Sequence, residues 1–146
     1  MLNDNIKITG DVVLSVVGPD GQIKEKREIK NLVVTAGKDF IASRMKDATA
    51  SVMSHFAIGT DDTSPVVGNT ALGAEAGRVA LGGTVVSGSQ VVYSATVPAG
   101  TGTGAIVEAG IFNAGSSGTM LCRTVFAVIN KGAADSLAAT WTITVS

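Results

Sequence analysis

Two apolar runs joined by a glycine-bounded turn constrain the fold of this chain more than any other segment. Residues 106–112 and 119–128 are rich in Ile, Val, Phe, Leu and Thr, which suit a pleated, half-buried surface. Between them, the sequence Gly115-Ser-Ser-Gly118 has the composition of a tight turn. The pattern therefore predicts a β-hairpin around which the rest of the chain is arranged.

The expected turn also sets a register for this hairpin. A two-residue loop at Ser116 and Ser117 would place Phe112 opposite Leu121 and Gly110 opposite Arg123. Glu108 would then be a diagonal neighbour of Arg123 on the same face, and opposite charges in that relation attract. The sequence therefore predicts a structural ion pair between Glu108 and Arg123.

Other β-rich segments lie on both sides of the hairpin. In chain order they are residues 6–17, 22–30, 31–35, 53–58, 78–86, 90–97 and 137–145. One segment, 36–47, instead has apolar residues at spacings of three and four, which predicts a short helix. We therefore expect an all-β fold, mainly antiparallel, in which about eight to ten strands form a β-sandwich or a partly open barrel of hairpins with one short α-helix.

Three local patterns add detail. Thr35 directly precedes the helix and can cap it through its side chain. The alternating charges of residues 23–29 predict an exposed or edge strand. Residues 70–78 predict one helical turn, in which Glu75 and Arg78 are three apart and form a second structural ion pair.

Composition limits the classes of partner. The chain has 146 residues, enough for a single β-rich domain spanning 1–146. A net charge of −1 gives no electrostatic reason to expect nucleic acid or an anionic membrane as a partner. No apolar run is long enough to cross a bilayer. Only 16% of residues are charged and 45% are apolar, which predicts apolar surface buried against other proteins.

The residues that carry chemistry are few and scattered. The single cysteine, Cys122, excludes an internal disulfide and predicts a core residue of a protein made in a reducing cytoplasm, and the start of the chain lacks the pattern of a secretory signal. The single histidine, His55, has no marked nucleophile beside it. Asp61 and Asp62 lack the repeated carboxylates of a calcium loop, and the glycines of 98–104 lack the end of a phosphate loop. We therefore expect no enzyme, no catalytic residue, no cofactor, no metal and no small-molecule substrate.

Several segments resemble small structural proteins of tailed bacteriophages. They are Asn31-Leu-Val-Val-Thr-Ala-Gly-Lys-Asp-Phe-Ile-Ala-Ser-Arg44, Phe56-Ala-Ile-Gly-Thr60 with the later Thr70-Ala-Leu-Gly-Ala-Glu-Ala-Gly-Arg78, and Glu108-Ala-Gly-Ile-Phe-Asn-Ala114 with Met120-Leu-Cys-Arg-Thr-Val-Phe126. The resemblance covers roughly residues 30 to 145 and includes both capsid decoration (cement) proteins and tail-fibre or tail-tip proteins.

The resemblance implies a virion protein without enzymatic activity. Because the sequence has no long repetitive shaft, a decoration protein on the outer capsid surface is the favoured class, with a baseplate, adaptor or fibre-base subunit of the tail as the alternative. A decoration protein would bind the major capsid protein and copies of itself, as a symmetric homo-oligomer, and would stabilise contacts between capsomers. A carbohydrate-binding or hydrolytic module is a third class, but the aromatics and carboxylates that it needs are not clustered.

Two segments are candidates for reaching a neighbouring subunit. Residues 1–10 could form an extended N-terminal arm, and residues 59–77 form the longest irregular loop. The candidate interface residues within them are Leu2, Ile6, Ile8, Asp61, Asp62, Pro65, Val66 and Val67.

Overall fold

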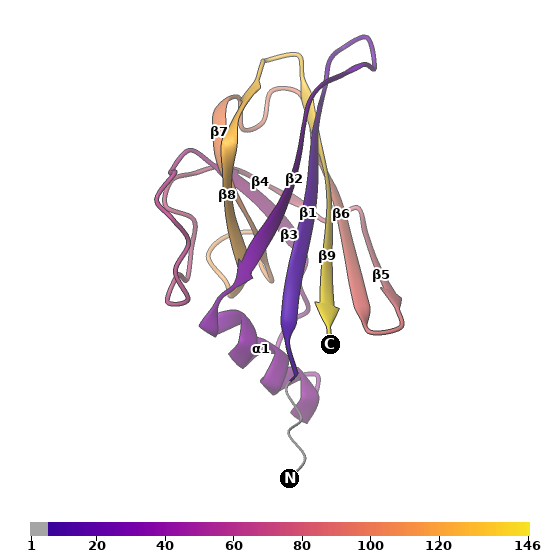
Figure 1. Cartoon of the computed structure of the whole chain (residues 1–146), viewed down its shortest axis with the longest axis vertical. Coiled ribbons are helices and arrows are strands. Elements are labelled where there is room, and N and C mark those ends of the chain that lie inside the picture. Colours follow the sequence, from indigo (N-terminus) through magenta and orange to yellow (C-terminus); the bar gives the residue numbers. More distant parts are fainter. Residues whose placement is uncertain (1–5) are drawn as a thin grey trace.

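This computed structural model describes residues 6–146, which contain nine antiparallel strands and one helix (Figure 1). The strands are β1 (Ile8–Val17), β2 (Ile23–Val33), β3 (His55–Gly59), β4 (Glu75–Ala80), β5 (Gly83–Ser87), β6 (Gln90–Val97), β7 (Gly104–Phe112), β8 (Met120–Lys131) and β9 (Ser136–Val145), and the helix is α1 (Thr35–Lys46). They form one sheet in the order β4-β3-β7-β8-β2-β1-β9-β6-β5. The expected all-β, mainly antiparallel fold is therefore confirmed.

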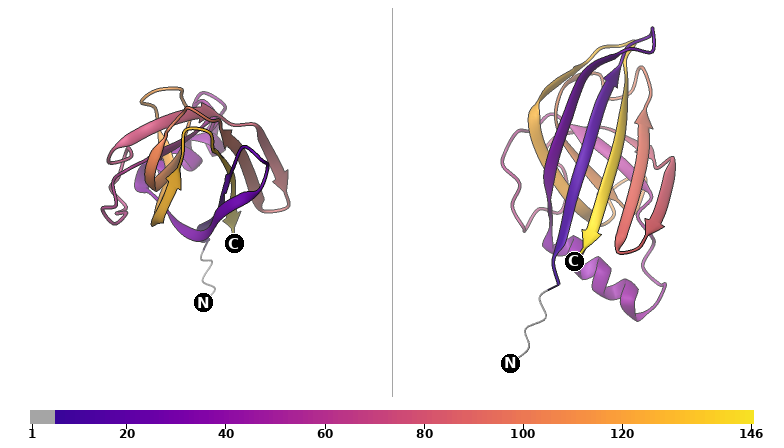
Figure 2. Two further views of the ribbon diagram at one scale, coloured as in Figure 1. Left: turned by 90° about the horizontal axis from the view of Figure 1, so that it is seen from above. Right: turned by 45° about the vertical axis from the view of Figure 1, so that its right-hand side comes forward.

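The sheet curls into a half-barrel, as the view from above shows (Figure 2). Strand β2 joins its two halves: it pairs with β1 along nearly its whole length, but with β8 only through Leu32 and Val33. Where β2 and β8 separate, Arg27 donates to the carbonyl oxygen of Val128 at 2.9 Å. Strand β2 contains the charged segment 23–29 and is exposed, as expected. It has a neighbouring strand on each side, β8 and β1, and is therefore not an edge strand.

Strands β1 and β9 are neighbours along their whole length. Their pairing runs from Ile8 opposite Val145 to Val17 opposite Ser136. It continues one step further, because the backbones of Lys7 and Ser146 exchange hydrogen bonds of 2.6 and 2.8 Å. The two chain ends of the described structure therefore lie side by side.

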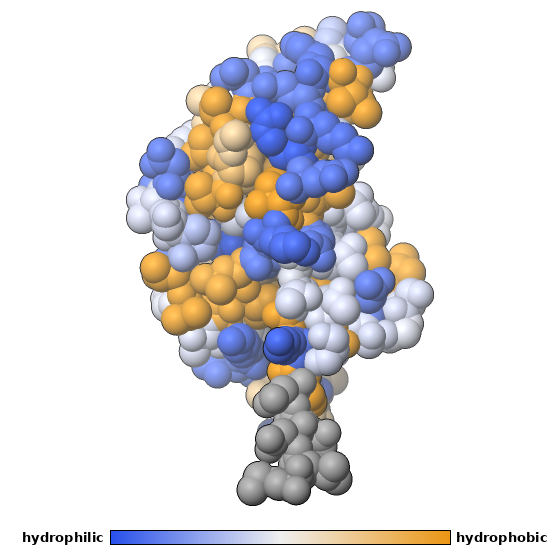
Figure 3. Space-filling view, viewed as in Figure 1, coloured by the Kyte–Doolittle hydropathy of each residue, from blue (hydrophilic) through white to orange (hydrophobic). Residues whose placement is uncertain are grey.

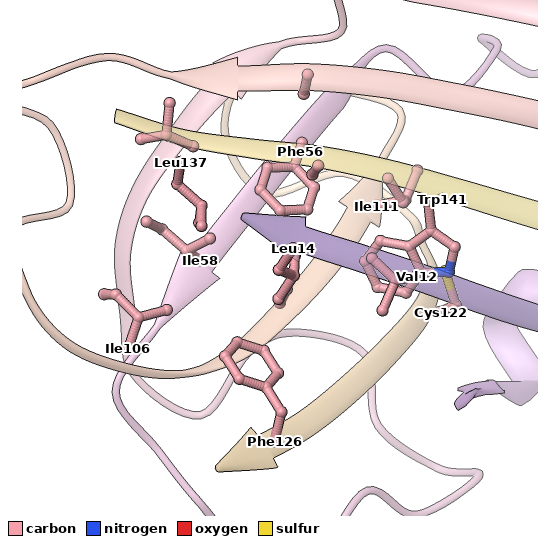
Figure 4. Close-up of a cluster of buried hydrophobic side chains, with 14 of the residues drawn as sticks. Val12, Leu14, Phe56, Ile58, Ile106, Ile111, Cys122, Phe126, Leu137 and Trp141 are labelled. Atoms are coloured by element: carbon pink, nitrogen blue, oxygen red, sulfur yellow. The ribbon is translucent and has the colours of Figure 1, made fainter. Parts of the chain in front are cut away.

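The core fills the inside of the curl. Side chains from both halves of the sheet meet there, among them Val12, Leu14, Phe56, Ile58, Ile106, Ile111, Phe126, Leu137 and Trp141 (Figure 4). Phe56 and Trp141 meet edge to face, with ring centroids 6.2 Å apart at 71°. The indole N–H of Trp141 donates to Oδ1 of Asn31 at 2.9 Å, so this buried polar group has a partner.

Helix α1 closes one end of the half-barrel (Figure 1). It packs on β8 through Gly37, where an added Cβ would collide with the carbonyl oxygen of Leu121. The expected capping by Thr35 is wrong. Val34 is the N-cap and offers no side-chain hydrogen bond, while the backbone N–H of Thr35 donates to the carbonyl of Val67 at 2.8 Å. At the start of α1, a backbone hydrogen bond to a distant loop therefore satisfies an N–H group, in place of the expected side-chain cap by Thr35.

The β7–β8 hairpin keeps part of the expected register. Gly110 lies opposite Arg123, but Phe112 lies opposite Met120 and not Leu121, because a bulge follows Ile111. The connection is also longer than a two-residue turn. It spans residues 113–119 and is held by Asn113, whose Oδ1 accepts from the N–H of Thr119 at 2.7 Å.

The segment 70–86 departs most from expectation. Residues 75–80 form strand β4 and not a helical turn, and the expected strand 78–86 is divided at Leu81 and Gly82. The reason is tertiary: β4 pairs with β3 at one edge of the sheet, whereas β5 pairs with β6 at the other. At the crossing, Leu81 donates to the carbonyl of Ser54 at 2.8 Å and Gly82 to that of Ser94 at 2.7 Å.

Candidate interaction surface

A buried ion pair holds the long loop against the sheet. Arg123 donates from Nε to Oε1 of Glu108 at 3.1 Å, and the two side chains are 2% and 0% exposed. The remaining oxygen sites of Glu108 accept three backbone N–H groups of the loop, from Asp61 at 2.9 Å, Gly73 at 2.9 Å and Ala74 at 2.8 Å. Both members of the predicted pair therefore meet, and the carboxylate also binds both ends of the loop.

Arg123 fastens the same loop through its other nitrogens. Nη1 donates to the carbonyl of Thr63 at 2.9 Å and to Oδ1 of Asn69 at 3.3 Å, and Nη2 donates to the carbonyl of Asp61 at 3.3 Å. Leu72, a residue of the loop, is buried in a cluster with Ala57 and Phe112. The loop is shorter than the expected 59–77, because Gly59 ends β3 and residues 75–77 belong to β4. These contacts hold residues 60–74 against the sheet, so only the parts that project outward are free to meet a neighbour.

Of the two aspartates at the start of this loop, Asp61 has a structural role. Oδ1 of Asp61 accepts from the N–H and the hydroxyl of Thr63, at 2.9 and 2.7 Å. These two hydrogen bonds, the backbone one first, lower the pKa of the Asp61 carboxyl below its ordinary value. Asp62 is exposed. No group of three or more His, Cys, Asp or Glu side chains in residues 6–146 is arranged to hold a metal ion.

The other candidate interface residues are divided between surface and interior. Ile6, Val66 and Val67 are exposed, whereas Pro65 is half-buried. Ile8 is half-buried and packs against the core. Leu2 lies outside the described residues, as does the first half of the segment 1–10 expected to be an arm. Ile6 and Ile8 line one surface pocket with Lys7, Thr9 and Lys38. Residues 8–10 belong to strand β1 and pair with β9, so this part of the expected arm lies in the sheet.

The predicted pair of Glu75 and Arg78 is present, within strand β4. Arg78 donates to both carboxylate oxygens of Glu75, at 3.0 and 2.6 Å. Its guanidinium also lies 3.8 Å from the ring centroid of Phe112 and donates to the carbonyls of Ala114 and Ser117, both at 2.9 Å. Arg78 therefore anchors the β7–β8 connection to β4.

His55 has a partner that sequence reasoning missed. Its Nδ1 lies 2.8 Å from the hydroxyl of the adjacent Ser54. A serine activated by histidine also needs a group that orients the imidazole from its other side. Among the described side chains, none hydrogen-bonds to the second ring nitrogen. Cys122, the other reactive residue type, is fully buried, and this burial raises the pKa of its thiol well above the ordinary value.

An apolar groove lies between the helix and the β5–β6 hairpin. It has a volume of about 520 Å³, and its lining side chains come from α1, from the segment before β3 and from one face of the hairpin: Phe40, Ile41, Arg44, Met45, Val52, Met53, Thr84, Val86, Val91 and Tyr93. Met45 is 84% exposed, although helical spacing places it on the apolar face of α1. The groove is therefore apolar surface that the fold itself does not cover.

Strand β5 borders this groove and ends the sheet. Its residues, Gly83-Thr-Val-Val-Ser87, carry no charge, and Val85 and Val86 are 61% and 71% exposed. The whole segment 79–107 lacks Asp, Glu, Lys and Arg. Figure 3 shows hydrophilic residues gathered over the upper parts of β1 and β2, whereas the right-hand edge near β5 is mostly pale, with a few hydrophobic residues. An uncharged, exposed edge strand is a natural site for pairing with another strand.

Sequence reasoning missed this surface because it treated each segment separately. The sequence showed 90–97 as a β-rich segment and the apolar spacing of 36–47, but only the fold shows that both border the same uncovered groove. The uncharged run 79–107 was the available signal.

Comparisons with known proteins find no relative of this chain. No protein-family model matches the sequence, and searches of curated proteins and of solved structures find no significant match. The helix of the described structure is too short and too polar to cross a membrane.

Proposed function

We propose that this chain is a capsid decoration (cement) protein of a tailed bacteriophage, which binds the outer surface of the assembled shell and stabilises contacts between capsomers. The class is supported by the resemblance of residues 31–44, 56–60, 70–78, 108–114 and 120–126 to small virion proteins. One structural observation carries the mode of action: an uncovered apolar groove of about 520 Å³ adjoins an uncharged edge strand. Such a surface suits a protein partner better than a soluble metabolite or a nucleic acid.

Rigidity of the fold supports the same proposal. The ion pair of Glu108 and Arg123 fixes the longest loop, and Arg78 fixes the β7–β8 connection. A subunit whose loops are already held in place loses little conformational entropy when it docks. If it binds only the assembled shell, it shifts the equilibrium between intact and disrupted shells toward the intact form by mass action.

The first test locates the protein in the particle. Virions of the phage that encodes this chain are separated into heads and tails, and the chain is quantified in each by mass spectrometry. We expect it with the heads, in far more copies than any tail component. Recovery with the tails alone would overturn the decoration role and favour the alternative, a baseplate, adaptor or fibre-base subunit.

The second test asks whether the groove makes the contact. Purified protein is added to shells that lack it, and the amount retained after sedimentation is measured, together with the temperature at which the shells break. Met45→Glu places a charge in the groove at an exposed position, whereas Val128→Glu places one on β8, where Val128 is 44% exposed. We expect Met45→Glu to lose binding and Val128→Glu to retain it. Equal binding by both variants would exclude the groove.

A further inference from the structure

We propose that two copies of this chain pair edge to edge through β5, so that their sheets continue across a two-fold axis. This inference concerns the isolated protein and does not rest on the decoration role. The starting observation is that β5 ends the strand order and pairs with β6 on one side only. No strand of residues 6–146 pairs with its other side, where backbone N–H and C=O groups meet the general requirement for adding a strand.

Charge favours a second copy as the occupant. In a two-fold antiparallel pair, each strand meets its own sequence reversed, so any charge near the axis would meet a like charge. Strand β5 and its whole hairpin partner β6 contain no charged residue, so this pairing brings no like charges together within the strands. The opposite edge differs: β4 carries Glu75 and Arg78, which protect an edge from such pairing.

Two-fold symmetry and full overlap of the strand together select one register. Residues directly opposite each other in an antiparallel pair project to the same face of the sheet, whereas neighbours along a strand project to opposite faces. A two-fold axis perpendicular to the sheet keeps each face on its own side. The axis must therefore pass beside a residue that lies opposite its own copy. Full overlap of the five residues of β5 puts Val85 opposite Val85 and Gly83 opposite Ser87. Thr84 then lies opposite Val86, and these two are the β5 residues that line the apolar groove. The grooves of the two copies would therefore join on one side of the extended sheet, and the exposed Val85 side chains would contact each other on the other side.

The register gives a charge-swap test with the full-length protein. Oligomeric state is measured by sedimentation velocity over a range of concentrations for the wild type, Val85→Lys, Val85→Glu and an equimolar mixture of the two variants. Because Val85 is 61% exposed, neither substitution disturbs the core, and circular dichroism verifies the fold. We expect a dimer for the wild type, at least a tenfold weaker dimer for each variant alone, and recovery of the dimer in the mixture, where Lys meets Glu across the axis.

Val128→Lys is the matched control, since it adds the same charge to an exposed valine of β8 and should leave the dimer unchanged. A wild type that stays monomeric at all concentrations, or that forms a trimer, would overturn the proposal. So would a dimer that persists in both single variants, which would place the contact elsewhere, or a mixture that fails to recover it. Met45 lines the same groove but lies on α1, outside the paired strand, so Met45→Glu should keep the dimer. Loss of shell binding with the dimer intact therefore distinguishes a failure of the decoration role from a failure of the β5 pairing.

Discussion

Arg123 and Glu108 form an ion pair of 3.1 Å inside the protein, and the backbone of a loop more than thirty residues earlier in the chain completes the hydrogen bonding of both. Two buried charges are tolerated where each has partners for its remaining donors and acceptors. Here those partners are supplied by residues 61–74, so the pair and the loop stabilise one another.

We expect Arg123→Met to lower the free energy of unfolding by about 3–5 kcal/mol, because it leaves the Glu108 carboxylate buried without its cation. Urea unfolding followed by the fluorescence of Trp141, the single tryptophan, measures the change. Glu75→Gln is the control, since Glu75, paired with Arg78, is 35% exposed and its loss should cost no more than about 1 kcal/mol. A smaller effect at Arg123 than at Glu75 would contradict the assigned role of the buried pair.

A second prediction concerns the contact between β1 and the core tryptophan. A Cβ at Gly10 would collide with the amide of Asn31, which accepts the hydrogen bond of Trp141. We expect Gly10→Ala to destabilise the protein by about 1–3 kcal/mol and to shift the emission of Trp141, because the displaced amide leaves the buried indole N–H unpaired.

A double-mutant cycle isolates that cause. In an Asn31→Ala background the collision no longer exists, so Gly10→Ala should then have little effect on the free energy of unfolding. Equal costs in both backgrounds would mean that Gly10 is required for another reason.

Close packing of the helix on β8 gives a third prediction. Gly37→Ala would push a methyl group into the backbone carbonyl of Leu121, which cannot move aside as a side chain could. We expect a loss of about 1–3 kcal/mol in the free energy of unfolding, measured by thermal and urea denaturation. At Gly68 an added Cβ meets nothing within 4 Å, so Gly68→Ala should be close to neutral. Similar behaviour of the two variants would show that the helix does not pack as described.

The fourth prediction concerns stability in acid. The backbone N–H of Gly132, at 2.8 Å, and then the ammonium of Lys24 lower the pKa of the Asp135 carboxyl. A carboxyl with a lower pKa in the folded state stabilises the protein above its unfolded pKa, near 3.9, and loses that contribution as the pH falls through the folded value.

Asp135→Asn should therefore reduce the fall in the free energy of unfolding between about pH 5 and pH 2. Denaturation at a series of pH values measures the slope for the variant and the wild type. Part of the slope should remain, because Asp47 and Asp61 also have lowered pKa values. An unchanged slope would show that Asp135 does not contribute to the pH dependence.

Local rules predicted those features that depend on near neighbours in the chain. The strand pattern, the short helix and the opposition of Gly110 and Arg123 follow from periodicity and from a single hairpin. The ion pair of Glu108 and Arg123 follows from that same register. The hydrogen bonds to the loop could not follow, because they need the N–H groups of Gly73 and Ala74 brought across the molecule.

Features set by tertiary contacts were missed for the same physical reason. Nothing within residues 78–86 shows that the run must divide at Leu81, since the division depends on which edge of the sheet each half joins. The start of α1 likewise depends on the carbonyl of Val67 in a distant loop. The apolar groove is the largest omission, because it arises only where α1 and the β5–β6 hairpin approach without filling the space between them.

The pairing of Lys7 with Ser146 determines how this protein resists force. The two strands that carry these residues are antiparallel neighbours, and their hydrogen bonds lie perpendicular to the strand direction. A force that pulls Lys7 and Ser146 apart would break the backbone hydrogen bonds between β1 and β9 one after another, so the two strands would separate at low force. A force applied through the side surfaces of the sheet would instead act on many of these hydrogen bonds at once. The subunit therefore resists force better when its neighbours contact those surfaces than when it is pulled by its ends.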